Sequence, residues 1–335
     1  MGYALRRLLP GLVLVALAAS ALLLSDLGRR RSASPARKRI ALFSWTSRPI
    51  LDDSVRGAVA ALAARGWADG AGAEVVLMKP EGDNATAAAM AASIVDGNYD
   101  VAISFGTLAL QSLAAANRDG KVKHVFCTVT DPAGAGVGIS RLSPLAHPKW
   151  LAGIGTFQPV KAAFRLARQA NPGLRRVGTV WCPCESNSEA CVKEAREVSA
   201  ELGIELLEAS VDSTSGVAEA TRAVVARGAE AIWIGGDNTV ETAMSAIVEA
   251  ARQGLIPVFA NAPSHVDVGV LFGLGADYEA VGRYAGEIAA SVLSGGDLAA
   301  VRIENVVPER LAVNPAALGG LRESWKLPKA DEVVR

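Results

Sequence analysis

Short apolar runs alternate with alanine-rich stretches along most of the chain. Apolar runs without polar alternation are typical of strands buried on both faces, and the stretches between them have the length of helices. The expected strands are residues 40–45, 75–79, 101–105, 122–129, 177–181, 204–209, 231–234, 258–260 and 270–274. The expected helices are residues 54–65, 85–96, 108–117, 160–171, 188–202, 216–227, 240–253 and 278–293. This alternation predicts an α/β fold built on doubly wound parallel sheets.

The length of 335 residues favours two such lobes. About four strand–helix units lie on either side of residues 130–159, a loop-rich stretch that contains glycine and proline. We therefore expect two Rossmann-like lobes with a ligand cleft between them. Ligands of such sheets bind at the carboxyl ends of the strands, so the loops that follow the strands are the place to look for a site.

The first 38 residues are typical of a targeting segment. Arg6 and Arg7 precede an apolar run at 8–27, and basic residues follow it up to residue 38. A run of about 20 apolar residues can span a bilayer, whereas the apolar core of a cleaved signal peptide is shorter. We expect residues 1–38 to be an uncleaved signal anchor, or a signal peptide, followed by a basic linker. The remainder is then periplasmic or otherwise extracytoplasmic, with a membrane tether if the segment is kept.

Composition and motifs exclude several functions. Lysine and arginine balance aspartate and glutamate at 34 each, so no basic field favours nucleic acid as a partner. The three histidines have no metal-ligand spacing, and no catalytic motif is present. Gly134, Gly136 and Gly138 follow a proline turn instead of leading from a strand into a helix, which argues against a nicotinamide cofactor. We expect neither an enzyme nor a cofactor nor a metal site.

Polar candidate residues follow three of the first four expected strands. Ser44 and Trp45 come at the end of the first strand and could hydrogen-bond or stack on a ligand. A polar turn that only caps the next helix would have the same kind of sequence. Thr107 opens a helix after the third strand, where free amides suit a carboxylate or phosphate. Asp131 follows the fourth strand and could receive an ammonium group, or only form a turn.

The later loops add acidic candidates. Asp237 and Asn238 follow Gly235-Gly236 at the start of a helix, and Asp277 stands in the same position after the last strand. An acidic group directed into a cleft between lobes is what an amine ligand needs.

The order of the loops resembles one family. The segments "VTDP", "ESNS", "DNT" and "GADYEAVGR" are together similar to ABC-transporter substrate-binding proteins, a family that includes tryptophan- and tyrosine-uptake binding proteins. The resemblance covers about residues 38–325 and implies a type I periplasmic-binding-protein fold, with three crossings between the lobes and ligand capture by hinge closure. It implies a first lobe of residues 39–145 and 262–297, and a second lobe of residues 146–261 and 298–328.

The resemblance also implies which residues face the ligand. By position they are Thr107, Asp131, Asn187, Asp237, Asn238 and Asp277, and in the amino-acid binders such groups hold the α-ammonium and α-carboxylate. Arg48 stands where the family usually has histidine, which places a cation near the ligand. This departure and others lie at positions that determine ligand specificity in the family. The resemblance therefore does not imply that this chain binds tryptophan.

The expected function is therefore the solute-binding component of an ABC importer. Its partners would be a small polar organic ligand and an ABC permease in the membrane. An amino acid or a similar molecule is a plausible ligand. The alternative is a ligand-sensing ectodomain that signals to a membrane partner. Two other functions have less support. A sugar-type transcriptional regulator would need DNA-binding helices before the first lobe, where the sequence has an apolar segment and a short linker. An enzyme of unknown type would need a catalytic motif, and the sequence shows none.

Three of the four cysteines lie within ten residues, in "WCPCESNSEACV". Four zinc ligands cannot be assembled from this stretch, and its spacing is not that of a Cys-x-x-Cys redox motif. In an oxidising compartment we expect a disulfide between Cys191 and either Cys184 or Cys182. Such a bridge would hold the loop at the rim of the cleft.

Overall fold

The computed structural model describes residues 19–20 and 37–334. The expected anchor or signal segment therefore lies outside the described residues, apart from Ala19 and Ser20. Within the described part of the chain, no helix is both long enough and apolar enough to cross a membrane. Residues 39–335 form one unit, and that unit carries the fold described below.

A six-stranded sheet forms the core of the first lobe. Its strand order is β11-β5-β4-β3-β1-β2. The strands are β1 (Lys38–Ser44), β2 (Ala73–Met78), β3 (Val101–Phe105), β4 (Lys123–Val129), β5 (Leu151–Gly155) and β11 (Glu304–Asn305). The pairs β1–β3, β3–β4, β4–β5 and β5–β11 are parallel. The continuous apolar runs predicted a parallel sheet, although β5 and β11 are not among the expected strands.

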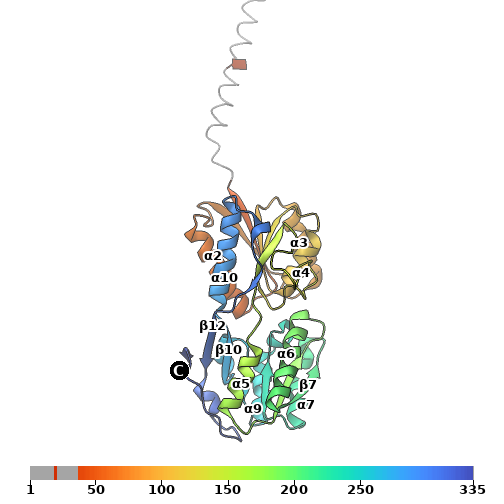
Figure 1. Ribbon diagram of the computed structural model, residues 1–335, viewed down its shortest axis with the longest axis vertical. Coiled ribbons are helices and arrows are strands. Elements are labelled where there is room, and N and C mark those ends of the chain that lie inside the picture. Colours follow the sequence, from red (N-terminus) through yellow and green to blue (C-terminus); the bar gives the residue numbers. More distant parts are fainter. Residues whose placement is uncertain (1–18, 21–36, 335) are drawn as a thin grey trace, which may run out of the picture. The chain divides into compact units, whose positions relative to one another are not determined.

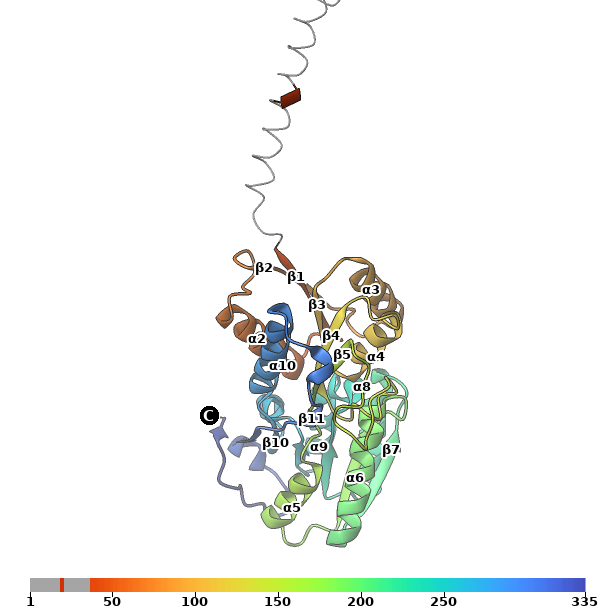
Figure 2. The same cartoon turned by 45° about the horizontal axis from the view of Figure 1, so that its top comes forward.

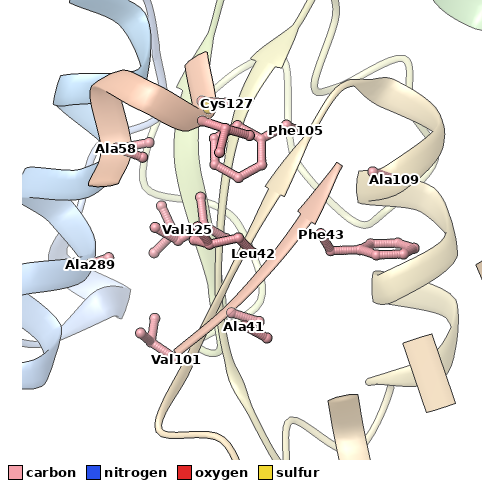
Figure 3. Packing of buried hydrophobic residues seen from close by; sticks show 14 of the residues in the cluster. Ala41, Leu42, Phe43, Ala58, Val101, Phe105, Ala109, Val125, Cys127 and Ala289 are labelled. Atoms are coloured by element: carbon pink, nitrogen blue, oxygen red, sulfur yellow. The ribbon is translucent and has the colours of Figure 1, made fainter. Parts of the chain in front are cut away.

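Helices cover both faces of this sheet. α2 (Pro49–Ala64) and α10 (Tyr278–Leu293) lie side by side on one face, and α3 (Asn84–Asp96) and α4 (Thr107–Ala116) cover the other (Figures 1 and 2). Leu42 and Phe43 of β1 point to opposite faces, with Phe43 directed toward α4 (Figure 3). α2 and α10 approach closely because Gly57 and Gly282 lack side chains. A Cβ on Gly282 would lie 1.9 Å from the backbone oxygen of Ser54.

A seven-stranded sheet forms the core of the second lobe. Its order is β13-β12-β10-β9-β8-β6-β7, with β12 antiparallel to β10. The strands are β6 (Arg176–Trp181), β7 (Glu205–Ser210), β8 (Ala231–Ile234), β9 (Val258–Ala260), β10 (Phe272–Ala276), β12 (Glu309–Val313) and β13 (Glu332–Val333). α5 (Val160–Ala170) and α6 (Ser186–Leu202) pack together, as do α7 (Val217–Ala226) and α9 (Met244–Gln253). The short helix α8 (Asn238–Glu241) precedes α9.

The predicted two-lobed α/β fold is confirmed, and the chain passes between the lobes three times. The passages follow β5, β10 and β11. Sheet membership differs from the expected lobe ranges in three places. β5 pairs with β4, and β11 with β5, in the first sheet, whereas β10 pairs with β9 in the second. The last strand–helix unit is therefore divided, because β10 completes the second sheet while α10 packs on α2 of the first lobe.

Most helix bounds lie within two residues of the expectation, and two differences are larger. α2 begins at Pro49 instead of residue 54, because proline is well suited to the first turn of a helix. The helix expected at 240–253 is divided into α8 and α9. The division leaves α8 as a separate short element, and its Asn238 and Glu241 line a cavity.

Candidate ligand-binding site

A small polar cavity lies where loops of the two lobes meet. Its volume is about 30 Å³, which is space for about two water molecules. Its walls come from the carboxyl ends of strands in both sheets, where α/β proteins bind their ligands. The lining residues are Arg48, Ile50, Leu51, Gly106, Thr107, Thr128, Thr130, Thr156, Gln158, Asn187, Gly236, Asp237, Asn238, Glu241 and Tyr278.

The first lobe contributes threonine hydroxyls to this wall. Thr107 begins α4 directly after Gly106, whose φ of 94° suits glycine, and no side chain caps this helix. The pairing of β4 with β5 shifts register between Phe126 and Val129. At this shift Thr128 takes a left-handed φ of 57°, and its hydroxyl lies 2.7 Å from that of Ser54. The irregularity is a local distortion at a functional edge, as bulges often are.

The second lobe contributes the turn from β8 into α8. Gly236 lies against the cavity wall, and a Cβ there would come within 3.0 Å of the Gln158 side-chain amide. Asp237 then caps α8, accepting from the backbone N of Val240 at 2.8 Å. Its other oxygen accepts from the backbone N of Cys182 and from the Ser188 hydroxyl, both at 2.6 Å. Asp237 therefore ties α8 to the β6–α6 loop.

Glu185 holds the same turn from the opposite side. This buried carboxylate accepts from the backbone N and side-chain amide of Asn238 at 2.8 and 2.6 Å. It also accepts from the backbone N and hydroxyl of Thr239, at 2.8 and 2.7 Å. Charge-assisted hydrogen bonds of this kind are about twice as strong as neutral ones. The start of α8, which presents Asn238 and Glu241 to the cavity, is therefore firmly positioned.

Arg48 connects the two lobes across the cavity. It lies directly before α2, and its Nη1 donates to Glu241 Oε2 at 2.8 Å. Its Nη2 donates to the side-chain oxygen of Asn238. The Arg48 and Glu241 side chains are 10% and 2% exposed, so solvent screens this ion pair little. A single first-lobe residue thus binds two residues of α8.

Burial sets the charges in this region. Burial raises the pKa of Glu241 to about 7, and the Arg48 charge opposes the rise. Burial, together with the charge on Glu185, raises the pKa of Asp237 to about 6. His265 Nε2 lies 3.7 Å from Glu241, and burial together with Arg48 lowers the pKa of His265 to about 3. His265 is thus neutral at pH 7, and Arg48 faces an acidic second-lobe wall.

Three residues that line the cavity each have a buried polar atom without a hydrogen-bond partner within the described chain. These atoms are Arg48 Nε, Thr156 Oγ1 and Asn187 Oδ1. The Asn187 amide orientation follows from its partners, since Nδ2 donates to Glu185 Oε2 at 3.1 Å and to the Gly236 carbonyl at 2.8 Å. Each unpaired buried group costs about 1–3 kcal/mol. A bound polar molecule could satisfy all three.

Gln158 and Tyr278 line the cavity near two of the passages between the lobes. Gln158 Nε2 donates to the Tyr278 hydroxyl at 3.2 Å. The Cys191 thiol lies behind Gln158, with its sulfur 3.7 Å from Gln158 Oε1. Burial raises the pKa of Cys191 to about 12, so the thiol is not a nucleophile at neutral pH.

The structure brings half of the sequence-predicted site residues to the cavity. Thr107, Asn187, Asp237 and Asn238 line it, and their contact with a ligand stays a prediction. The other four, Ser44, Trp45, Asp131 and Asp277, do not line it.

Ser44 is fully buried, and Trp45 packs in the first-lobe core. Asp131 forms an ion pair with Arg141 and accepts from the backbone N of Gly134, closing its own turn. Asp277 caps α10, accepting from the backbone N of Ala280 at 3.0 Å, and lines a separate pocket. Their polar atoms are used in local structure, which the sequence pattern could not separate from ligand binding.

The expected disulfide partner of Cys191 is corrected by the structure. Cys182 and Cys184 form the disulfide, with Cα atoms 5.2 Å apart, and Cys191 is a free buried thiol. The reason is that Cys191 lies inside α6 on a face directed at Gln158. Cys127 is likewise free and buried.

Sequence reasoning missed Glu241, Thr156, Gln158 and Tyr278. Glu241 could have been found, because it lies one helical turn after Asp237 in "DNTVE" and so shares its face. Thr156 and Gln158 follow β5, a strand that the sequence pattern did not reveal.

Larger pockets exist elsewhere. One of about 220 Å³ is lined by charged residues and by Ser264, whose buried hydroxyl is the one unpartnered atom there among the described residues. Another, of about 430 Å³, is lined mainly by apolar residues that include Val248, Leu255 and Ile256. Its Asn314 is bonded to the backbone of Val266 and Ala316. The convergence of buried, partly unpartnered polar groups therefore selects the interlobe cavity as the candidate site.

Known proteins resemble this chain over most of its length. A tyrosine-binding protein of Clostridioides difficile is 23% identical over 309 residues, 90% of this chain and 88% of the relative. A crystal structure of a conserved domain protein from Vibrio cholerae has a TM-score of 0.82 at 27% identity, covering 89% of this chain and 99% of that one. A Streptococcus pneumoniae domain in complex with L-tryptophan has the same TM-score at 23% identity, covering 89% and 100%.

The family comparison is decisive for classification. The model of the ABC transporter substrate binding proteins matches residues 39–322, which is nearly all of the two lobes. The chain therefore belongs to the ABC transporter substrate-binding protein family, whose members bind solutes and are not enzymes.

Proposed function

We propose that this protein captures a small polar organic solute outside the cytoplasm and delivers it to an ABC permease in the membrane. The lobes close on the solute, and no bond is made or broken. An amino acid or a similar molecule fits the proposal, since the relatives described above include a tyrosine-binding protein and a domain bound to L-tryptophan.

The observation that carries the proposal is the cavity bridged by Arg48 and Glu241. Loops of both lobes supply its walls, and three of its buried polar atoms lack partners. Closing two lobes over a polar cavity is how hinge proteins enclose a ligand. We assign Asn187 and Thr107 to direct contact, and Asp237 and Asn238 to holding α8 in place.

Calorimetry and thermal unfolding of the purified full-length protein, with the twenty common amino acids as probes, test this function. A captured solute raises the melting temperature and reduces the radius of gyration. Asn187→Ala should weaken binding at least about tenfold, because the ligand loses one buried hydrogen bond. Asn84→Ala, at an exposed site on α3, is the control and should bind as the unmodified protein does.

If none of the probes stabilises the protein, amino-acid capture is rejected. If Asn187→Ala and the unmodified protein bind with equal affinity, the ligand binds somewhere other than this cavity.

A further inference from the structure

Arg48 limits the size of what the closed cavity can hold. With its guanidinium bonded to Glu241 and Asn238, about 30 Å³ remains. Every amino acid is larger than two water molecules, so binding requires the lobes to part, and an aromatic side chain requires the widest parting. A wide parting would separate Arg48 from Glu241 and leave this carboxylate without its cation. Losing one partner of a buried ion pair is strongly destabilising.

The unpartnered atoms on the wall define what chemical groups a ligand needs. Arg48 Nε can only donate a hydrogen bond, and Asn187 Oδ1 can only accept one. Thr156 Oγ1 can do either. A ligand that satisfies the first two must carry an acceptor and a donor a short distance apart. A carboxylate is the acceptor that best matches a guanidinium, and an amino group is a matching donor for an amide oxygen.

We propose that Arg48 determines the ligand class, so that the site takes a compact amino acid whose carboxylate meets Arg48 and whose amino group meets Asn187, and excludes aromatic amino acids. The inference rests on the proposed function and deepens it by naming the solute.

The distribution of charge supports this orientation. Apart from Arg48, the charged groups that line the cavity are Asp237 and Glu241, both on the second lobe, and Glu185 lies directly behind them. The negative wall favours the amino group, and Arg48 is the cation left for the carboxylate. An amino acid placed this way adds one positive and one negative charge, so the buried site gains no net charge.

The test compares compact amino acids with their amides, which lack the carboxylate charge. The probes are glycine, L-alanine, L-serine and the three corresponding amides, with L-tryptophan and L-tyrosine as bulky probes. The variants are Arg48→Met, which removes the charge, and Arg48→Lys, which keeps a charge but loses Nε. Arg56→Met is the matched control, because Arg56 lies on α2, the helix that follows Arg48, with its side chain 62% exposed. Circular dichroism confirms that each variant is folded.

We expect the unmodified protein to bind at least one compact amino acid at least about thirtyfold more tightly than its amide, the size of a charged hydrogen bond. In Arg48→Met, the amino acid and its amide should bind with affinities within about threefold of each other. Arg48→Lys should show an intermediate preference for the acid, and Arg56→Met should keep the full preference. L-Tryptophan and L-tyrosine should not bind the unmodified protein.

An acid-to-amide preference that survives in Arg48→Met overturns the inference but leaves solute capture intact. The same holds if an aromatic amino acid binds more tightly than every compact one. If no amino acid of either size binds, the proposed function and this inference both fail.

Discussion

Burial disfavours the negative charge on Glu241 that its ion pair with Arg48 requires. Its carboxylate is the partner of Arg48, yet burial raises its pKa to about 7. Near neutral pH the group is therefore close to the point at which it gains a proton and weakens the ion pair. A solute-binding site that depends on this pair should respond to pH.

The raised pKa of Glu241 predicts a loss of stability as pH rises. Between its ordinary pKa and about 7, the folded protein holds a proton that the unfolded chain has lost. Its contribution to the free energy of unfolding is therefore full at low pH and decreases as pH rises through about 7. Glu241→Gln, which cannot titrate, should lack this decrease, which we expect to be about 1–3 kcal/mol.

Urea unfolding of both proteins at pH 5, 6 and 7 measures the difference. The comparison is needed because the lowered pKa of His265 acts with the opposite sign, losing stability as pH falls. Parallel pH profiles for the two proteins would contradict the prediction.

At the scale of elements, the β6–α6 loop and α8 form one bonded assembly. Glu185 and Asp237 supply its carboxylates, and the Cys182–Cys184 disulfide lies at its start. The backbone N of Cys182 donates to Asp237, so the disulfide is next to the residue that caps α8. The loop thus acts as a support for Asn238 and Glu241 more than as a binding surface.

The disulfide assignment predicts a specific labelling pattern. Unfolding without reductant, followed by alkylation, should label Cys127 and Cys191 and leave Cys182 and Cys184 unlabelled in peptide mass spectrometry. Cys184→Ser should add Cys182 to the labelled set. It should also lower the free energy of unfolding by about 1–2 kcal/mol, the small value typical of a very short closed loop. Protection of Cys191 from the label would instead support its pairing with Cys182 or Cys184.

At the scale of the whole molecule, Arg48 is a contact between lobes that the chain otherwise joins by three short passages. Hinge proteins exist as open and closed populations, and a ligand shifts the balance by its preference for one of them. Under the proposed mechanism, the ion pair of Arg48 with Glu241 favours the closed form before any solute adds its own contacts.

Arg48→Met should therefore favour the open form of the solute-free protein. Loss of the pair removes about 3 kcal/mol from the closed form, roughly a hundredfold in the closed-to-open ratio. Small-angle scattering without added solute should show a larger radius of gyration for this variant than for Arg56→Met. Identical scattering from the two would show that the ion pair does not control closure.

The sequence by itself determined the fold class, and four of the eight site residues that it predicted line the cavity. Continuous apolar runs require strands covered on both faces, so the two parallel-sheet lobes followed from the pattern in residues such as Val101–Phe105. Asp237 and Asn238 were predictable because a strand, two glycines and a helix start place them at the ligand edge.

Only the tertiary structure decided which polar residues face the cavity and which close their own turns. Asp237 and Asp277 both follow strands and both cap helices, yet one lines the cavity and the other lies outside it. Arg48 and Glu241 are 193 positions apart, and no local pattern pairs them. Their meeting depends on how two lobes close on each other, which is a property of packing and not of any segment alone.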